Sequence, residues 1–251
     1  LASGNFYASW TNPANKYNVI VSNGLGSDTS LLESMARGFL VQGINTYSLD
    51  RAGSGINLPR KDISTWEDDL LSLAGKVNRP AIMAQCFSTG LVAEVTNTHP
   101  ELFSKAIYLT PSFYLNYEPS IMEKISIVLS FLTLSEMPHK NPVPIEAYTS
   151  SDSLRRVLRC DPLFSYSPTT STFIKGDRLK NKADRLLHHP RIPRIFVLAE
   201  KDIVVDNEKT EKHFAKKTIN GPFVCYIDSD HFIPFDNNSI KILAEVIKNE
   251  D

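Results

Sequence analysis

The stretch AIMAQCFSTG, residues 81–90, decides how the rest of the chain is arranged. Residues 81–84 are apolar, which is typical of a strand buried on both faces of a sheet. Residues 89–99 continue as an apolar run that stops before Pro100, as expected of a helix. Because so few residues separate the two elements, the sequence predicts one sharp turn with Cys86 at its centre.

A strand–turn–helix of this kind holds its middle residue in a strained backbone conformation and exposes its side chain. The residues two positions away on either side must be small, because strand and helix nearly touch there. Ala84 and Ser88 meet this requirement. The turn resembles the nucleophile elbow of the α/β-hydrolase superfamily, G-x-S-x-G, rewritten here as Ala84, Gln85, Cys86, Phe87 and Ser88. Both glycines are replaced, and a cysteine stands in the position of the nucleophile.

Two alternatives to a natural cysteine nucleophile stay open. A frame centred on Ser88 would use Cys86 and Gly90 as the small flanking residues, but it moves Thr89 into the turn and fits the apolar run less well. An engineered replacement of serine by cysteine would give the same sequence.

Length and composition indicate one α/β domain. A chain of 251 residues with 42% hydrophobic residues can bury a full core. The formal net charge of −1 gives no electrostatic reason to expect nucleic acid or an anionic membrane as a partner. No transmembrane or signal-peptide pattern is visible, and the sequence does not indicate the oligomeric state. Because the chain begins with Leu1, we expect that a preceding segment has been removed or is missing.

The cysteines and histidines outside the elbow predict neither disulfides nor a metal site. Three widely spaced cysteines form no disulfide framework and no metal-binding pattern, which favours a reducing, cytoplasmic environment. We expect Cys160 and Cys225 to be inert, since buried cysteines usually act as small hydrophobic residues. His188 and His189 precede Pro190, and we interpret them as an exposed pair rather than as metal ligands.

Strand and helix patterns alternate along the first part of the chain. We expect strands at residues 5–10, 17–22, 44–49, 81–84 and 104–109, and helices at residues 30–42, 66–76 and 89–99. Thr65 is predicted to cap the second of these helices, with Asp68 completing a capping box. The alternation predicts a mostly parallel sheet with helices on both faces.

The alternation is interrupted between residues 111 and 193. Residues 121–132 are strongly apolar but too few to span a bilayer. They form either a buried helix or a cap helix whose apolar face covers a pocket for an acyl chain. The alternation resumes with strands at 194–199 and 223–227 and helices at 208–217 and 239–248. We therefore predict a core of residues 1–110 and 194–251, with residues 111–193 inserted as a helical cap.

Three side chains that could serve as nucleophile, acid and base follow predicted strands: Cys86, Asp202 and His231. Ligand sites of open parallel sheets form at the carboxyl ends of the strands. The chain order of nucleophile, acid and histidine is the order of α/β hydrolases. Residues 198–202 resemble the acid loop of that superfamily, and residues 229–232 resemble its histidine loop. Asp202 would hold the imidazole of His231, which would take the proton from Cys86.

The resemblance also suggests an oxyanion hole. Residues 23–26, Asn-Gly-Leu-Gly, resemble the His-Gly-x-x oxyanion loop of the superfamily, with asparagine in place of histidine. It implies that the backbone N–H groups of Leu25 and Phe87 stabilise the tetrahedral oxyanion. Asp206 and Asp230 remain rivals of the predicted acid.

The resemblance covers nearly the whole chain and is strongest to capped lipases and thioesterases, including monoacylglycerol-lipase-like enzymes. Residues 85–89 also resemble the glycine-poor elbow of the acyl-ACP thioesterases and transferases of bacterial luminescence. The resemblance implies an α/β-hydrolase fold and a small-molecule acyl substrate, as an ester or a carrier-bound thioester. It implies a covalent acyl-Cys86 intermediate without metal or cofactor.

The same residues leave three functions open. The first is hydrolysis of acyl esters or thioesters. The second is acyl transfer or cyclisation, because an acyl-thioester enzyme stays reactive toward amines. The third is a catalytically silent receptor on the same fold, although a receptor has no need for Cys86, Asp202 and His231 together.

Overall fold

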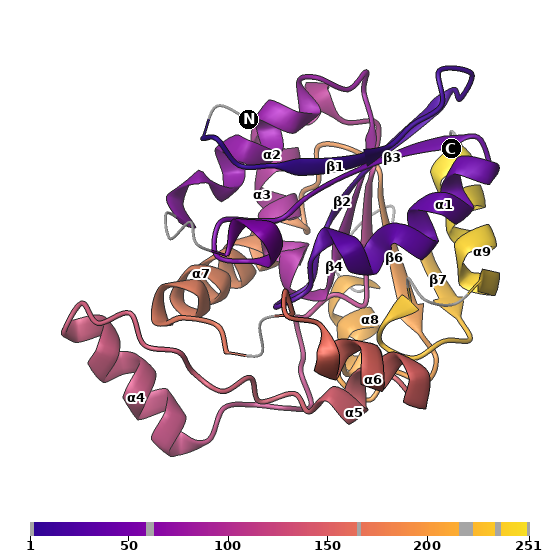
Figure 1. Cartoon of the computed structure of the whole chain (residues 1–251). Helices are drawn as coiled ribbons and strands as arrows, with labels where there is room; N and C mark the ends of the chain where they lie inside the picture. Colours follow the sequence, from indigo (N-terminus) through magenta and orange to yellow (C-terminus); the bar gives the residue numbers. More distant parts are fainter. Residues whose placement is uncertain (1–2, 59–62, 165–166, 216–222, 234–236, 250–251) are drawn as a thin grey trace.

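A seven-stranded sheet forms the centre of the protein (Figure 1). The computed structural model describes residues 3–58, 63–164, 167–215, 223–233 and 237–249. The strand order is β1-β3-β2-β4-β5-β6-β7; β1 pairs antiparallel with β3, and the remaining pairs are parallel. The predicted mostly parallel sheet is therefore confirmed.

The observed elements follow the predicted alternation closely. The strands are β1 (Tyr7–Trp10), β2 (Tyr17–Ser22), β3 (Ile44–Leu49), β4 (Ala81–Gln85), β5 (Ala106–Leu109), β6 (Arg194–Ala199) and β7 (Phe223–Ile227). The helices of the flanking layers are α1 (Glu33–Val41), α2 (Trp66–Ala74), α3 (Thr89–Thr98), α8 (Asn207–Ala215) and α9 (Asn237–Lys248). Four further helices, between β5 and β6, are α4 (Ile121–Leu132), α5 (Ile145–Tyr148), α6 (Asp152–Cys160) and α7 (Thr170–Leu186).

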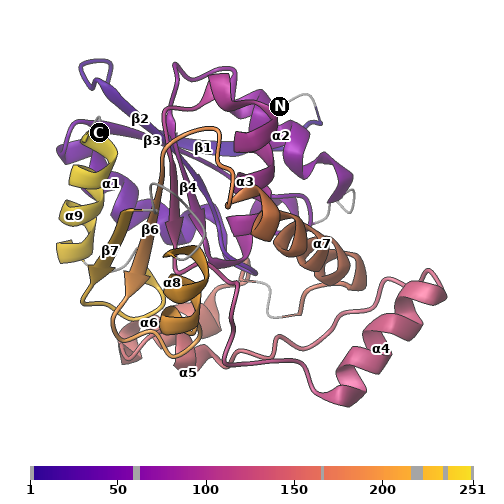
Figure 2. The same cartoon turned by 180° about the vertical axis from the view of Figure 1, so that it is seen from behind.

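Alternate residues of the central strands face two separate hydrophobic clusters. In β4, Ile82 and Ala84 belong to the cluster that α2, α3 and α7 cover, whereas Ala81 and Met83 belong to the cluster that α1 and α9 cover. Successive side chains of a strand point to opposite faces, so a strand covered on both faces is apolar throughout. Figures 1 and 2 show these two helical layers on either side of the sheet.

The predicted capping of α2 is wrong. The Thr65 side chain makes no capping hydrogen bond to this helix. A 3₁₀ turn, Ile63–Thr65, leads directly into α2, and Thr65 has helical dihedral angles (φ −79°, ψ −4°). A capping residue needs an extended backbone to aim its side chain at the first N–H groups of a helix.

The helix α7 packs against the core helix α3 although it lies in the predicted cap. A Cβ atom at Gly90 of α3 would lie 2.6 Å from the backbone carbonyl carbon of Leu179. Leu179 and Ala183 of α7 are buried in the same cluster as the residues of α3. The missing side chain at residue 90 thus allows the two helices to approach closely. The division into core and cap stays a prediction, and α7 shares its packing with the core.

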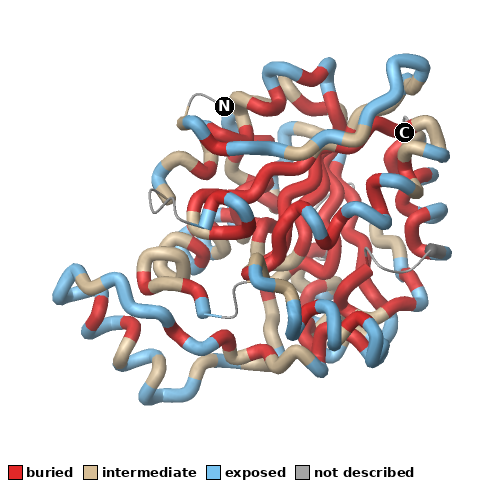
Figure 3. The backbone as a smooth tube through the Cα atoms, in the orientation of Figure 1, coloured by how far each residue is buried: buried red, intermediate tan, exposed pale blue. Residues whose placement is uncertain are grey.

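The helix α4 projects from the rest of the molecule (Figures 1 and 2). The expectation of a buried helix at residues 121–132 is wrong, because most apolar residues of α4 are exposed, among them Ile121, Met122, Ile125, Val128, Leu129, Phe131 and Leu132. Ile127 and Ser130 are its buried side chains. Figure 3 colours the backbone by this burial. Among the described helices, none combines the length and the apolar character needed to cross a membrane.

Candidate active site

Cys86 occupies the turn between β4 and α3. It begins a single 3₁₀ turn, Cys86–Ser88, and its φ angle is +45°. This left-handed region is strained for a residue with a side chain, so the predicted strained turn is confirmed. The carbonyl oxygen of Cys86 accepts hydrogen bonds from the hydroxyl groups of Thr89, at 2.7 Å, and Ser112, at 3.1 Å. These bonds hold the turn in place.

Asp202 and His231 meet at the same edge of the sheet. Asp202 follows β6 and His231 follows β7, and the two strands are parallel neighbours. Nδ1 of His231 lies 2.8 Å from Oδ2 of Asp202. The other carboxylate oxygen accepts hydrogen bonds from the backbone N–H groups of Val204, at 2.8 Å, and Val205, at 3.0 Å. Both side chains are almost completely buried, so this pair has one fixed geometry.

The electrostatic surroundings keep His231 protonated. Burial by itself would lower the pKa of the imidazole. The charges of Asp202 and Cys86, together with hydrogen bonds to both side chains, outweigh burial and raise the pKa of His231 to about 10. The three residues predicted from separate parts of the sequence therefore interact with one another at the carboxyl edge of the sheet.

The rivals of Asp202 have other partners. Asp206 pairs with Lys209 at 2.8 Å, at the start of α8. Asp230 accepts hydrogen bonds from the backbone N–H and the hydroxyl group of Ser150, both at 2.7 Å. Asp230 therefore holds the loop of His231 against the segment that contains α5 and α6, and Asp202 contacts the imidazole.

Arg51 is a site residue that the sequence analysis missed. Its guanidinium group is buried and donates hydrogen bonds to the carbonyl oxygens of Asn23 and Gly24 and to the hydroxyl group of Ser88. Burial lowers the pKa of Arg51 to about 10, against the opposing effect of the charges of Asp50 and Cys86. The one signal in the sequence is that Arg51 follows a predicted strand at the same sheet edge.

The contacts of Ser88 argue against a frame centred on this residue. Its side chain is buried, accepts a hydrogen bond from Arg51 and donates one to the carbonyl oxygen of Asn23. A nucleophile needs a base within hydrogen-bond reach and access to the substrate. The hydroxyl group of Ser88 instead ties the elbow to the loop that precedes Leu25.

Arg51 also orients the peptide group of Leu25. The Gly24 carbonyl oxygen lies 2.9 Å from Nη2 of Arg51. In a trans peptide, the carbonyl and the following N–H point in opposite directions, and the described chain has no cis peptide bond. The N–H of Leu25 therefore points away from Arg51. Leu25, Phe87 and Cys86 line one cavity.

The cavity above Cys86 has a volume of about 710 Å³. Its apolar wall comes from several elements and includes Phe113, Leu115, Ile127, Val128, Phe173 and Ile174. Charged side chains also line it, among them Lys124, Lys180 and Lys209. A cavity of this size and lining fits a ligand with an apolar chain.

The family was identified by comparison with known proteins. The family model Hydrolase_4, described as Serine aminopeptidase, S33, matches residues 13–238. The chain belongs to this family of α/β hydrolases. No curated protein sequence matches the chain. The family is named for serine enzymes, whereas the centre of the turn between β4 and α3 is Cys86 in this chain.

Solved structures share the fold over nearly the whole chain. A monoacylglycerol lipase from Paleococcus ferrophilus has a TM-score of 0.85 at 15% identity, covering 98% of this chain and 99% of its own. A soluble variant of the monoglyceride lipase from Saccharomyces cerevisiae, in complex with a substrate analog, has a TM-score of 0.82 at 14% identity, with coverage of 97% and 91%. A thioesterase domain from the curacin biosynthetic pathway has a TM-score of 0.67 at 12% identity, with coverage of 97% and 94%. These matches confirm the predicted α/β-hydrolase fold.

The two other cysteines of this hydrolase differ in their exposure. Cys225 is half-buried in β7, and burial raises the pKa of its thiol, which agrees with its predicted inertness. Cys160 is exposed at the end of α6, so its predicted inertness does not follow from burial.

The interpretation of His188 and His189 as an exposed pair is wrong for His188. His189 is exposed, whereas His188 is half-buried and faces His213 of α8. The sequence could not indicate this contact, because it depends on how α7 and α8 pack together.

Proposed function

We propose that the protein hydrolyses acyl esters or thioesters through a covalent acyl-Cys86 intermediate. The observation that carries this proposal is the buried pair of His231 and Asp202, 2.8 Å apart, whose imidazole interacts with Cys86 at the wall of an apolar cavity. A thiolate beside an imidazolium is a nucleophile that is ready to attack a carbonyl carbon.

Acylation begins when Sγ of Cys86 attacks the carbonyl carbon of the substrate. The N–H groups of Leu25 and Phe87 stabilise the resulting oxyanion, and each such donor typically contributes about 3–4 kcal/mol to transition-state stabilisation. When the tetrahedral intermediate collapses, the bond to the leaving oxygen or sulfur breaks and His231 donates its proton to that atom. The products of this step are the alcohol or thiol and an acyl-Cys86 thioester.

Deacylation uses the neutral imidazole that acylation leaves behind. His231 accepts a proton from a water molecule, whose oxygen attacks the thioester carbonyl carbon. The carbon–sulfur bond then breaks, the free acid leaves, and the thiolate and imidazolium are restored. Asp202 keeps Nδ1 of the imidazole oriented and stabilises its positive charge throughout.

The cavity supports a substrate with a single apolar acyl chain. In our proposal, residues 111–193 act as the cap, and Ile127 and Val128 of α4 contact the chain. Two structural neighbours are described as monoacylglycerol or monoglyceride lipases, and a third as a thioesterase domain. We extend this substrate class, acyl esters and thioesters, to the present chain.

Turnover of a chain-length series tests the proposal. The wild-type protein, Cys86→Ala and Cys86→Ser are incubated with p-nitrophenyl esters and acyl thioesters, and the free acid is quantified by mass spectrometry. We expect release of free acid that Cys86→Ala abolishes. Formation of an acylated amine or alcohol in place of the acid would favour acyl transfer. The absence of turnover and of any acyl adduct would favour a silent receptor.

A further inference from the structure

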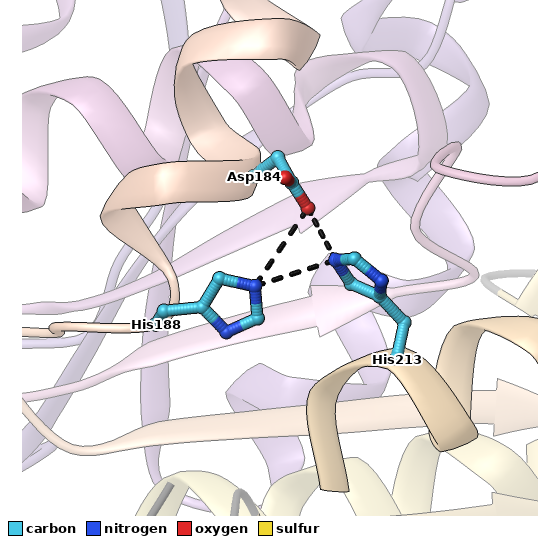
Figure 4. Close-up of side chains that lie close together, drawn as sticks. All are labelled: Asp184, His188 and His213. Atoms are coloured by element: carbon cyan, nitrogen blue, oxygen red, sulfur yellow. Dashed lines mark hydrogen bonds and ion pairs between the residues drawn. The ribbon is translucent and has the colours of Figure 1, made fainter. Parts of the chain in front are cut away.

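Three metal-ligating side chains meet between α7 and α8, outside the described lining of the Cys86 cavity (Figure 4). Nε2 of His188 lies 3.3 Å from Nε2 of His213 and 3.8 Å from Oδ1 of Asp184. Nε2 of His213 also contacts Oδ1 of Asp184. Asp184 and His188 are four residues apart at the end of α7, and His213 comes from α8.

Two of the three spacings between donor atoms fit a tetrahedral ion, and the third, between Nε2 of His213 and Oδ1 of Asp184, is a hydrogen-bond contact that lengthens when an ion binds. Zinc binds imidazole nitrogen and carboxylate oxygen at about 2.0–2.2 Å, which places neighbouring donors of a tetrahedron about 3.3–3.6 Å apart. The distances of 3.3 Å and 3.8 Å are close to this spacing. Two imidazoles and one carboxylate suit Zn²⁺, Co²⁺ or Ni²⁺, whereas Mg²⁺ and Ca²⁺ prefer oxygen ligands alone.

Neighbouring side chains orient both imidazoles toward the common point. The hydroxyl group of Tyr114 lies 3.0 Å from Nδ1 of His213. If this hydroxyl accepts the Nδ1 proton, the lone pair of His213 lies on Nε2, as a metal ligand requires. The ring of His188 stacks on the buried ring of Phe214, with centroids 5.4 Å apart at 34°. The two imidazoles are thus positioned before an ion arrives, and the contact between His213 and Asp184 opens when it binds.

We propose that Asp184, His188 and His213 bind one Zn²⁺-like transition-metal ion that joins α7 to α8. The ion would tie a helix of the predicted cap to a helix of the core. Because Phe173, Ile174 and Gly176 of α7 line the cavity, it would also fix one cavity wall. The site is separate from the catalytic residues, and the proposal departs from the expectation that the protein binds no metal.

A rival interpretation is a cluster held by hydrogen bonds alone. In that case the Nε2–H of His213 donates to Asp184, the hydroxyl group of Tyr114 donates to Nδ1 of His213, and the cluster has no affinity for an ion. The two interpretations differ in the proton position on His213 and in whether zinc stabilises the fold.

Zinc binding is measured on protein that carries Cys86→Ala, because a thiolate beside His231 would itself bind zinc. After removal of metal with EDTA, ZnCl₂ is titrated by calorimetry and the melting temperature is recorded. We expect one ion per chain and a rise in Tm of about 5 °C or more at 100-fold excess over Kd. His188→Gln and Asp184→Asn should weaken binding at least about 10-fold, whereas the neighbouring His189→Gln should leave it unchanged.

Cobalt gives a second readout that does not depend on stability or activity. Co²⁺ bound by two imidazoles and a carboxylate should show visible absorption bands of a four-coordinate ion, absent from His188→Gln and present in His189→Gln. Two results would overturn the proposal. One is the lack of any zinc-dependent shift in Tm and any cobalt band; the other is binding that survives His188→Gln or is lost equally in His189→Gln.

Discussion

The proposed catalytic edge of the sheet and the helix α4 both border the cavity, but they are built in opposite ways. At the edge, the side chains of Asp202, His231 and Arg51 are buried and make hydrogen bonds, between Asp202 and His231 and from Arg51 to the Gly24 carbonyl oxygen. In α4, the apolar side chains that the sequence pattern would place in a core are largely exposed (Figure 3). The chemistry of the site therefore depends on rigid packing, whereas α4 can change without disturbing it.

This difference separates catalysis from the choice of substrate. A change at the catalytic edge should affect the rate, the stability or both, because each group there has several partners. A change in α4 should alter the acyl chains that the protein accepts and leave the fold intact. The following predictions test this division, in order of decreasing effect.

The largest effect is expected for His231→Gln. In the proposed mechanism His231 transfers protons in both steps, so kcat should fall by at least about 1,000-fold in this variant. The rate is measured under saturating p-nitrophenyl ester, with circular dichroism to confirm the fold. A variant that keeps more than about a tenth of the wild-type kcat would remove His231 from the mechanism.

The protonated His231 should make stability depend on pH. Its pKa is raised from 6.5 to about 10 in the folded protein. The stabilisation that protonated His231 supplies is therefore complete below pH 6.5 and is lost as the pH rises toward about 10. The melting temperature should fall over this interval more steeply in the wild-type protein than in His231→Gln. Parallel curves would contradict the assigned charge.

The close packing of α7 on α3 predicts that Gly90→Ala destabilises the protein. The new Cβ would meet backbone atoms of Leu179 at 2.6 Å, and such overpacking costs about 1–3 kcal/mol. The melting temperature should fall by about 2–10 °C. Gly75→Ala is the matched control, since its Cβ would lie 3.5 Å from the carbonyl oxygen of Leu71, an ordinary van der Waals contact. Equal stability of the two variants would show that α7 is not held against the core.

The smallest effect on stability is expected in α4. Changing Ile127 and Val128 together to serine should lower kcat/KM for long-chain esters roughly 10-fold relative to short-chain esters, because apolar contact with the chain is lost. Ile121→Ser and Leu132→Ser, which lie outside the described lining of the cavity, are the controls and should leave this ratio unchanged. An equal loss of kcat/KM for all chain lengths would indicate that α4 supports catalysis rather than the selection of the acyl chain.

The sequence predicted those parts of the fold in which burial imposes a regular pattern of apolar residues. The predicted limits of β2 and β3 agree with the observed strands, and in β2 the β-branched residues 19–21 mark a strand that is covered on both faces. The elbow was recognisable because its small residues and its central Cys86 lie within a few positions of one another. Asp202 and His231 were recognisable because each follows a buried strand at the same edge.

The features that could not be predicted from the sequence depend on contacts between elements that are distant in the chain. The apolar pattern of residues 121–132 predicted that α4 is buried. A sequence pattern does not show which other elements pack against a helix in the folded protein. Arg51 donates hydrogen bonds to Asn23, Gly24 and Ser88, and no local motif predicts these contacts. His188 meets His213 because α7 and α8 lie together in the folded protein.

The most direct test of the central claim is the mass of the intact protein after brief exposure to a p-nitrophenyl ester. The wild-type protein and Ser88→Ala should each gain one acyl group, because Ser88 is occupied by Arg51 and Asn23. Cys86→Ala should gain none. An acyl adduct that persists in Cys86→Ala and disappears in Ser88→Ala would contradict the assignment of Cys86 as the nucleophile.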